Sequence, residues 1–297
     1  MTRRQETAAL LALYQGRRKG WITLADEIEE CGSALAVLER DLVTGQGDLL
    51  TLASDPVAER LATVEAQLSD WEAAGLQLVT LLEDEYPDQL RSVHQRPPFL
   101  FYRGRLDRND SSGVAVVGTR NPSDAGMRRA QEIAGGLAEQ GRTVVSGLAT
   151  GIDTCAHRAA LAAGGRTVAV IGTGLLRSYP AENADLQRQL AEEHLVLSQF
   201  WPDAPPTKSS FPLRNAVMSG YAAATVVVEA AWKSGARMQA RLALEHGRPV
   251  FLLESLLEHD WARSYAERPG TTVVTDAQEV LDRLDQLQAV PGRLVWA

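Results

Sequence analysis

Residues that build disulfides and metal sites are scarce in this sequence. Its 297 residues include only two cysteines, Cys31 and Cys155, which lie far apart in the chain. Two distant thiols supply neither a disulfide framework nor the ligand spacing of a zinc site. We therefore expect a reduced protein of the cytoplasm that holds no metal ion.

Long apolar runs are absent as well. No stretch of about 18 or more uncharged apolar residues occurs, so no transmembrane helix is expected. A short apolar patch near the N-terminus is flanked by charges, and no small-residue cleavage site follows it, which argues against a signal peptide. These absences predict a protein without a membrane partner.

The motifs of common enzyme sites are also missing. The chain contains no G-x-S-x-G elbow, no H-E-x-x-H pair and no P-loop G-x-x-x-x-G-K-[ST]. An acid, a base and a nucleophile are hard to assemble from what is present, whereas turns suited to anions are common. The sequence predicts a binding protein rather than an enzyme, and no cofactor.

Charge gives limited guidance on the ligand. The formal net charge of −8 would disfavour nucleic acid as a partner. However, Gly113–Val250 holds 14 basic and 11 acidic residues, whereas the rest of the chain holds 16 and 27. This mildly basic middle is compatible with an anionic ligand and equally with ordinary variation.

The first 75 residues show helical periodicity. With 297 residues, 45% of them hydrophobic, the chain suffices for one large domain or two unequal ones. Ser33 and Asp55 are suitable N-caps and Gly75 a suitable C-cap, so we predict a small helical, SAM-like domain over 1–75. Its helices are expected at Thr7–Tyr14, Leu24–Glu30, Ser33–Leu42 and Asp55–Ala74.

Residues 76–112 are predicted to connect this domain to the next. They begin with a strand-like run, Leu76–Leu82, and continue as an ordered, proline-punctuated segment, Glu83–Gly104. The polar stretch Asp107–Ser112 marks the expected boundary, and a second domain is predicted over 113–297.

Short apolar runs alternate with helical stretches through this second domain. Such alternation indicates βαβ units, and continuous apolar runs are typical of buried parallel strands. The predicted fold class is α/β, with a doubly wound, mostly parallel sheet. The expected strands are Val114–Val117, Thr143–Ser146, Thr167–Ile171, Leu195–Leu197, Thr225–Val228, Val250–Leu253 and Thr271–Val274. The expected helices are Asp124–Gln140, Asp153–Ala163, Glu182–Glu193, Arg214–Tyr221, Gly235–His246 and Asp276–Leu287.

Ligands of such sheets bind beyond the carboxyl ends of the strands. Gly118, Thr119 and Arg120 follow the first of these strands. The next helix N-terminus offers free N–H groups to a phosphate, and Arg120 adds a permanently charged fork. A bare turn with a solvated arginine accounts for the same residues.

Glycine turns also follow the next two strands. Ser146, Gly147 and Gly151 follow the second strand, and Gly172 and Gly174 follow the third. Tight glycine loops can direct backbone N–H groups outward as an anion-binding nest.

Two side chains beside these turns have structural explanations. His157 follows Asp153 by one helical turn, so a local hydrogen bond between them accounts for the pair at least as well as chemistry does. Glu229 ends an apolar strand and could bind a ribose hydroxyl or pair with an arginine such as Arg214. For Glu229, structural pairing is favoured.

Lys208–Asn215 is the most suggestive stretch. Lys208, Phe211, Arg214 and Asn215 place two cations, an aromatic ring and an amide at the start of a predicted helix. Cations follow a phosphate backbone, and an aromatic face stacks on a base with about 1–3 kcal/mol. A core Phe211 beside a solvated Lys208 is an equally good interpretation of this segment alone.

Four co-linear blocks together resemble a known family. They are GVAVVGTRNPSDAG, VVSGLATGIDTCAHRAAL, TVAVIGTGLLRSYPAENADL and FPLRNAVMSGYAAATVVVEAAWKSGA. With YPDQLRSVHQRPPFLFYRG before them, they resemble the DprA (Smf) family of DNA-processing proteins of bacterial transformation. The likeness covers about residues 80–250, and residues 1–75 match weakly.

The resemblance implies an extended Rossmann fold that binds single-stranded DNA without cutting it. It also implies a homodimer that protects single strands and helps to load the RecA recombinase onto strands coated by single-strand-binding protein. DNA uptake, competence and recombination are the implied setting. The implied DNA-binding residues are Arg120, Lys208, Phe211, Arg214 and Asn215, with Gly118, Thr119, Ser146, Gly147, Gly151, Gly172 and Gly174.

The chain departs from the family's pattern in three places. Ala216 stands where the family usually has a second arginine, Ser234–Ala240 reads SGARMQA in place of S-G-[ST]-L-x-T-A, and Glu254–Gly270 replaces a glycine-rich stretch. The family's dimer and RecA surfaces lie toward this later part. Two alternatives stay open: a Rossmann-fold enzyme of the nucleoside-monophosphate phosphoribohydrolase type, which the order of residues after Glu229 disfavours, and a divergent paralogue acting as a protein scaffold.

Overall fold

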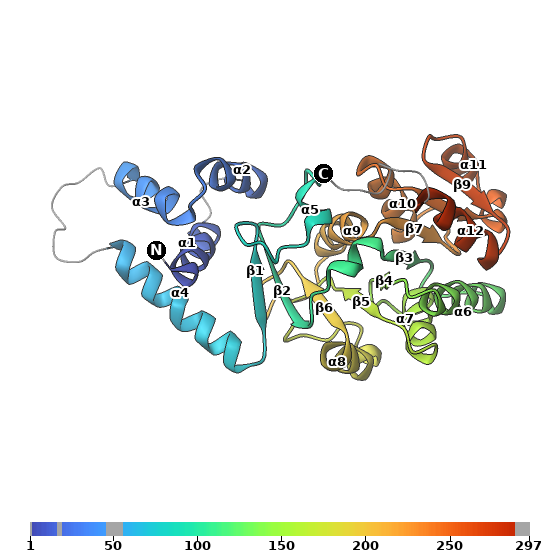
Figure 1. Cartoon of the computed structure of the whole chain (residues 1–297), viewed down its shortest axis with the longest axis horizontal. Coiled ribbons are helices and arrows are strands. Elements are labelled where there is room, and N and C mark those ends of the chain that lie inside the picture. Colours follow the sequence, from blue (N-terminus) through green and yellow to red (C-terminus); the bar gives the residue numbers. More distant parts are fainter. Residues whose placement is uncertain (1, 17–19, 46–55, 289–297) are drawn as a thin grey trace. The chain divides into compact units, whose positions relative to one another are not determined.

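The computed structural model describes residues 2–16, 20–45 and 56–288, and the chain divides into two compact units (Figure 1). The first unit comprises residues 1–86 with 97–100, and the second comprises 87–96 with 101–297. Residues 76–112, predicted as a connection, are thus shared between both units, and Asp107–Ser112 belongs to the second. The three-part division with limits at 75 and 112 stays a prediction.

The first unit is helical and is built around its N-terminal helix. Residues 8–14 of α1 are all buried, and α1 packs against α3 and α4. The Tyr14 ring centroid lies 5.0 Å from that of Trp21 and 5.7 Å from that of Phe99. The elements of this unit are α1 (Arg3–Gly16), α2 (Trp21–Cys31), α3 (Ala34–Gly45), α4 (Pro56–Ala73) and β1 (Gln77–Thr80).

All four helices expected here are confirmed, as are two of their caps. The Ser33 hydroxyl accepts a hydrogen bond from the Ala36 amide at 3.1 Å. Gly75 adopts the left-handed conformation at φ +75°, and its amide donates to the Glu72 carbonyl. The expected cap at Asp55 lies outside the described residues.

The second unit is an α/β sheet whose strands follow the order β2-β6-β5-β4-β3-β7-β8-β9. Every neighbouring pair is parallel except β2 with β6, which is antiparallel. The predicted fold class, a doubly wound and mostly parallel sheet after a helical N-terminal part, is confirmed. The strands are β2 (Phe99–Gly104), β3 (Val114–Val117), β4 (Val144–Ser146), β5 (Thr167–Val170), β6 (Leu195–Ser198), β7 (Ala224–Val227), β8 (Val250–Leu253) and β9 (Thr271–Val274).

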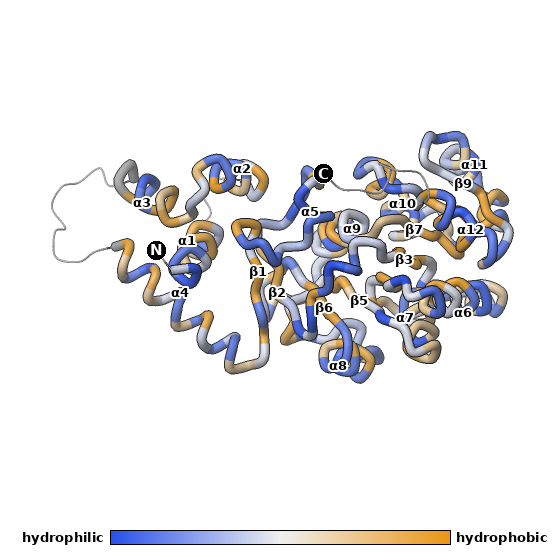
Figure 2. The backbone as a smooth tube through the Cα atoms, viewed as in Figure 1, coloured by the Kyte–Doolittle hydropathy of each residue, from blue (hydrophilic) through white to orange (hydrophobic). Residues whose placement is uncertain are grey.

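Helices cover both faces of this sheet (Figure 1). On one face α7 packs on β3, β4 and β5, with α6 and α8 beside it; on the other, α9 packs on β5 and α10 on β7. The strands are apolar while the helices carry polar residues on their outer sides, as expected for buried parallel strands (Figure 2). These helices are α5 (Asp88–Arg91), α6 (Asp124–Glu139), α7 (Ile152–Ala162), α8 (Ala184–Glu193), α9 (Ser210–Tyr221), α10 (Gly235–Glu245), α11 (Asp260–Ala266) and α12 (Ala277–Gln288).

Several described elements differ from what the sequence predicts, among them the short helix α5 within the expected connection. Phe99–Gly104, expected as part of a connection, forms strand β2 and pairs with β6. Helix α9 begins at Ser210 rather than near Arg214, so Phe211 lies in its first turn. Helix α11 was not predicted. Pairing with β6 and packing of the buried Trp261 favour these structures, and neither contact is visible in local periodicity.

A buried carboxylate, Asp110, stabilises the end of the sheet at which β3 begins. Asp110 is fully buried and accepts two hydrogen bonds from Arg166, at 2.6 and 2.8 Å. The hydroxyls of Thr143 and Tyr221 also donate to it, at 2.9 and 2.8 Å. Because two of the four hydrogen bonds come from a charged guanidinium, this network stabilises the end of the sheet opposite the predicted ligand site.

Candidate nucleic-acid interface

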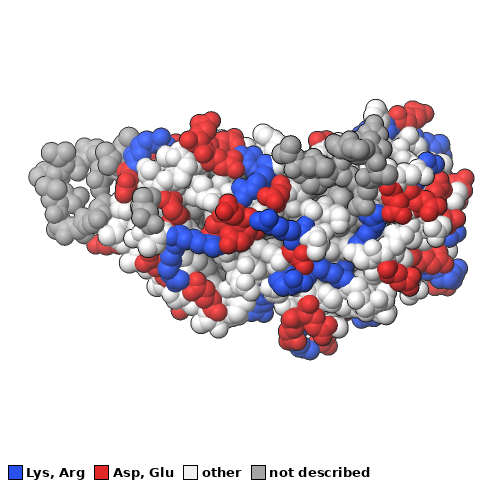
Figure 3. Space-filling view, viewed as in Figure 1, with Lys and Arg blue, Asp and Glu red and all other residues white. Residues whose placement is uncertain are grey.

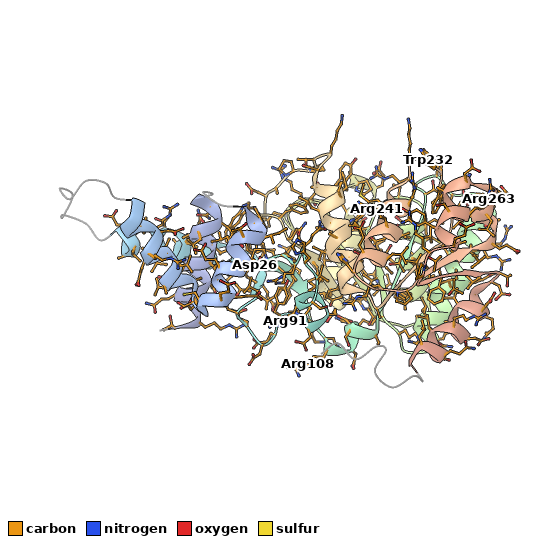
Figure 4. All side chains as sticks on the ribbon, turned by 90° about the horizontal axis from the view of Figure 1, so that it is seen from above. Asp26, Arg91, Arg108, Trp232, Arg241 and Arg263 are labelled. Carbon is orange, nitrogen blue, oxygen red and sulfur yellow. The ribbon has the colours of Figure 1, made fainter. Side chains whose placement is uncertain are left out.

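A pocket of about 440 Å³ opens where the order of strands reverses. The strands β3 and β7 are neighbours, but the chain leaves them toward helices on opposite faces, so their following loops separate and leave a crevice. The lining includes Gly118, Thr119 and Arg120 after β3, Phe211, Arg214 and Asn215 of α9, and Lys233, Ser234 and Gly235 after β7. Figure 4 shows Trp232 of the β7–α10 loop on the side opposite Arg108, which precedes β3.

The turn after β3 is held in place by the carboxylate of Glu229, which lies in the loop after β7. Glu229 accepts hydrogen bonds from the Ser123 amide at 3.2 Å and from the Ser123 hydroxyl at 2.8 Å. The Ser123 hydroxyl in turn accepts from the Gly126 amide at 3.0 Å and so caps α6. Glu229 therefore pairs with Ser123 rather than with Arg214, which corrects the partner suggested by the sequence.

Arg120 and Phe211 come together at the mouth of the pocket. The Arg120 guanidinium carbon lies 5.4 Å from the centroid of the Phe211 ring, and the Tyr179 ring lies 5.7 Å from the same centroid. Arg120 is exposed and makes no ion pair with any residue of the described ranges. Tyr179, also exposed, was not among the predicted site residues. The three side chains form a cationic and aromatic surface open to solvent.

Arg214 lies at the floor of the pocket rather than at its rim. Only 6% of the Arg214 surface is exposed. Its guanidinium donates to the carbonyls of Gly147 and Val170, the latter at 2.8 Å. Its Nε donates to the Asn215 side chain at 2.9 Å. Burial lowers the pKa of Arg214, and the charge of nearby Asp153 opposes that effect. This arginine links α9 to the turn after β4 and to the end of β5, and it also places positive charge beneath the pocket.

Asp153 and His157 do not form the local pair that their spacing suggests. The His157 Nδ1 lies 2.7 Å from the Thr167 hydroxyl, which itself donates to the Val144 carbonyl, so Nδ1 carries the proton and donates. Burial, together with the charge of Arg214, lowers the pKa of His157 to about 3. Burial raises the pKa of Asp153, while Arg214 lowers it. His157 is thus a neutral core residue.

The glycine turns pack closely against their surroundings. Gly151 has φ +82°, and a Cβ there would overlap the Thr119 carbonyl. A Cβ on Gly147 would overlap the Arg214 guanidinium, and one on Gly172 would lie 2.9 Å from the Phe211 ring. A Cβ on Gly174 would overlap the Trp201 and Pro202 carbonyls. These glycines allow close approach of the chain and thereby position the pocket's side chains.

The predicted site residues therefore fall into two groups. Gly118, Thr119, Arg120, Phe211, Arg214 and Asn215 line the pocket, whereas Ser146, Gly147, Gly151, Gly172 and Gly174 do not. The Ser146 hydroxyl is buried and donates to the Val116 carbonyl at 2.7 Å. Lys208 is exposed three residues before Phe211 and does not line the pocket.

Several lining residues escaped the sequence analysis. Lys233, Ser234, Met218 and Gln239 line the pocket from the β7–α10 loop and from α9 and α10. In the sequence, Glu229 was considered at the end of a predicted strand, and the position of Lys233 just after that strand was the available signal for Lys233. Met218 and Gln239 belong to helix faces, which carry no comparable signal.

Other kinds of site are not seen in the described ranges. Within residues 2–16, 20–45 and 56–288 no group of three or more His, Cys, Asp or Glu side chains is placed to hold a metal ion. None of the helices in those ranges is long and apolar enough to cross a membrane.

The sheet order and the crevice define a Rossmann-like protein with a cationic, aromatic pocket at its switch point. The family model described as DNA recombination-mediator protein A matches residues 77–285, and the chain belongs to this family of DNA-processing proteins, known as DprA or Smf.

Relatives with known sequences and structures agree with this assignment. The chain is 42% identical to DNA processing protein DprA of Streptococcus pneumoniae over 68% of this chain and 72% of that protein. It is 44% identical to protein Smf of Synechocystis over 60% of this chain, and that match spans 46% of the relative. The solved structure of the S. pneumoniae protein matches with TM-score 0.68 at 38% identity, covering 84% of this chain and 91% of that one.

A further structure concerns DNA directly. A DNA processing protein A from Helicobacter pylori, described in terms of its single-stranded DNA binding mode, matches with TM-score 0.63 at 28% identity. The match covers 71% of this chain and 96% of that chain.

Proposed function

We propose that this protein binds single-stranded DNA at the switch-point pocket, without cutting it. The observation that carries the proposal is the pairing of the exposed Arg120 guanidinium with the accessible Phe211 ring at the pocket mouth. A cation there binds phosphate while the ring stacks on an unpaired base. Paired bases of a duplex do not offer their faces, so this arrangement favours single strands.

The charges around the pocket support the same ligand. Arg120, Lys208 and Lys233 form no ion pair with a residue of the described part of the chain, so all three can bind phosphate oxygens. Of the acidic residues, Asp153 lines the pocket, and others gather away from it, for example over α8 in Figure 3. The relation to the H. pylori protein, whose structure is described for its single-stranded DNA binding mode, is consistent with this choice.

We further propose that the protein has the cellular role that the family resemblance implies. The protein would protect single strands, act as a homodimer in the cytoplasm, and help to load RecA onto strands covered by single-strand-binding protein during DNA uptake and recombination. The sequence of the pocket supports the DNA-binding step, and the partner contacts are inferred from the family.

The test is a binding titration of the full chain with a labelled dT oligomer and with a duplex of equal length. Arg120→Ala and Lys208→Ala should each weaken binding to the oligomer and reduce the steepness of its salt dependence, because each removes one phosphate contact. Arg188→Ala is the matched control, since Arg188 is exposed on α8 and pairs with Asp185 at 2.8 Å. Equal affinity of the wild type and the Arg120 and Lys208 variants would overturn the pocket assignment.

A further inference from the structure

A strip of alternating aromatic rings and arginines lies next to the pocket. The Arg237 guanidinium carbon is 3.9 Å from the Trp232 ring centroid and 5.9 Å from that of Tyr265. The Arg268 guanidinium carbon is 4.1 Å from the Tyr265 ring centroid. We call these four residues, Trp232, Arg237, Tyr265 and Arg268, the stacked strip.

The stacked strip is continuous with the pocket along the chain. Trp232 lies between Ala231 and Lys233, both of which line the pocket, and its side chain is not part of that lining. It is 57% exposed, and Figure 4 shows it at the edge of the second unit. The exposed Trp232 ring is therefore within reach of a DNA strand that leaves the pocket past Lys233.

The two arginines of the stacked strip are not neutralised by acidic side chains of the described residues. Arg237 donates weakly to the Trp232 carbonyl, at 3.4 Å, and neither it nor Arg268 forms an ion pair with a described residue. By contrast, the next arginine on the same helix, Arg241, pairs with Glu245 at 2.7 Å. Arg268 is exposed and Arg237 is half-buried, and the buried Tyr265 ring supports both. An arginine that stacks on a ring by its face still presents N–H groups at the guanidinium edge, where phosphate oxygens bind.

The strip lies where this chain departs from the pattern of the family resemblance. Arg237 stands where the pattern of the family resemblance has a leucine, and Tyr265 and Arg268 lie in Glu254–Gly270, which replaces a glycine-rich stretch. The two departures thus meet in space, from α10 and from α11 with its following turn.

We infer that the stacked strip is a second single-stranded DNA subsite that continues the path from the switch-point pocket. Trp232 stacks on a base, and Arg237 and Arg268 bind the phosphates that flank it. This inference rests on the proposed function of the pocket. A protein partner is the competing interpretation, since Trp, Tyr and Arg are also common at protein interfaces. The unpaired arginines next to a cationic pocket favour a polyanion.

The test compares dT oligomers of about 6 and about 20 nucleotides, because only the longer one can fill the pocket and the strip together. Trp232→Ala and Arg237→Glu should each weaken binding of the longer oligomer roughly tenfold and leave the shorter one nearly unchanged. Arg241→Glu is the matched control on the same helix and should have little effect. Trp232→Phe keeps a ring and should restore most of the affinity.

Fluorescence supplies a readout that altered folding would not mimic. Stacking on a base should quench Trp232, so the wild type should lose more emission with the longer oligomer than Trp232→Phe does. If neither oligomer binds the wild type, the proposed function fails; if both bind and the strip variants bind equally well, only the strip inference fails. Strip variants that bind DNA normally but change the sedimentation coefficient would make the strip a protein interface and overturn the inference.

Discussion

At the scale of single residues, the pocket depends on space left for one buried guanidinium. Gly147 has no side chain, and Arg214 fills the place where its Cβ would be while donating to the carbonyls of Gly147 and Val170. The glycine is required by this close approach rather than by its backbone angles, because it does not have a positive φ.

Gly147→Ala should therefore displace Arg214 and lower the free energy of unfolding by about 1–3 kcal/mol, as overpacking does. Binding of a dT oligomer should weaken as well. Gly135→Ala is the control, since a Cβ at Gly135, inside α6, would meet nothing within 4 Å. That variant should be stabilised by about 0.5–1 kcal/mol. Urea titrations measure both, and equal midpoints for the two variants would contradict the prediction.

At the scale of elements, the turn between β3 and α6 is held in place by Glu229, which lies in the loop after β7. Ser123 caps α6 and also donates to Glu229, so one side chain links the two loops that enclose the pocket. Arg120 lies three residues before Ser123 in this turn, and the link limits how far its backbone can move.

Ser123→Ala should cost about 1 kcal/mol of stability, the usual effect of losing an N-cap, and should weaken oligomer binding although Ser123 itself does not line the pocket. Ser123→Thr keeps the hydroxyl and should retain both properties. Thermal unfolding and the dT titration provide the measurements. Full affinity in the alanine variant would show that the cap does not position Arg120.

At the scale of the whole molecule, His157 makes stability depend on acidity. Its pKa is lowered to about 3 in the fold, mainly by burial, whereas an unfolded histidine titrates near pH 6.5. The neutral form is favoured by the fold, so its contribution is complete above pH 6.5. As the pH falls from 6.5 toward 3, the unfolded chain binds the proton first and stability is lost.

The wild type should therefore lose about 1.4 kcal/mol of unfolding free energy per pH unit in this window, relative to a variant without the imidazole. His157→Asn is suitable because its amide nitrogen can take the place of Nδ1 opposite Thr167. Asp153, whose pKa is raised by burial, acts in the opposite direction in both proteins and cancels in the comparison. Parallel urea midpoints from pH 7.5 to 4.5 would refute the prediction.

Local sequence was enough to predict most elements, and six of the twelve residues named for the site line the pocket. The strands of the sheet are continuous apolar runs, and Val114–Val117, Val250–Leu253 and Thr271–Val274 were predicted to the residue. Arg120 and Phe211 were found because a charged turn and a ring near a helix start are visible without a fold. β2 was missed because a short strand at the end of a proline-rich segment owes its structure to pairing with β6.

The sequence by itself determined the alternation of strands and helices, since hydrophobic periodicity follows from side-chain geometry alone. It also determined which residues follow each strand, and hence the composition of the ligand edge. Only the tertiary structure decided that Glu229 binds Ser123, that Arg214 is buried beneath the pocket, and that Trp232 and Arg237 stack beside Tyr265 and Arg268. Those contacts join residues far apart in the chain, and their partners are set by strand order and helix packing.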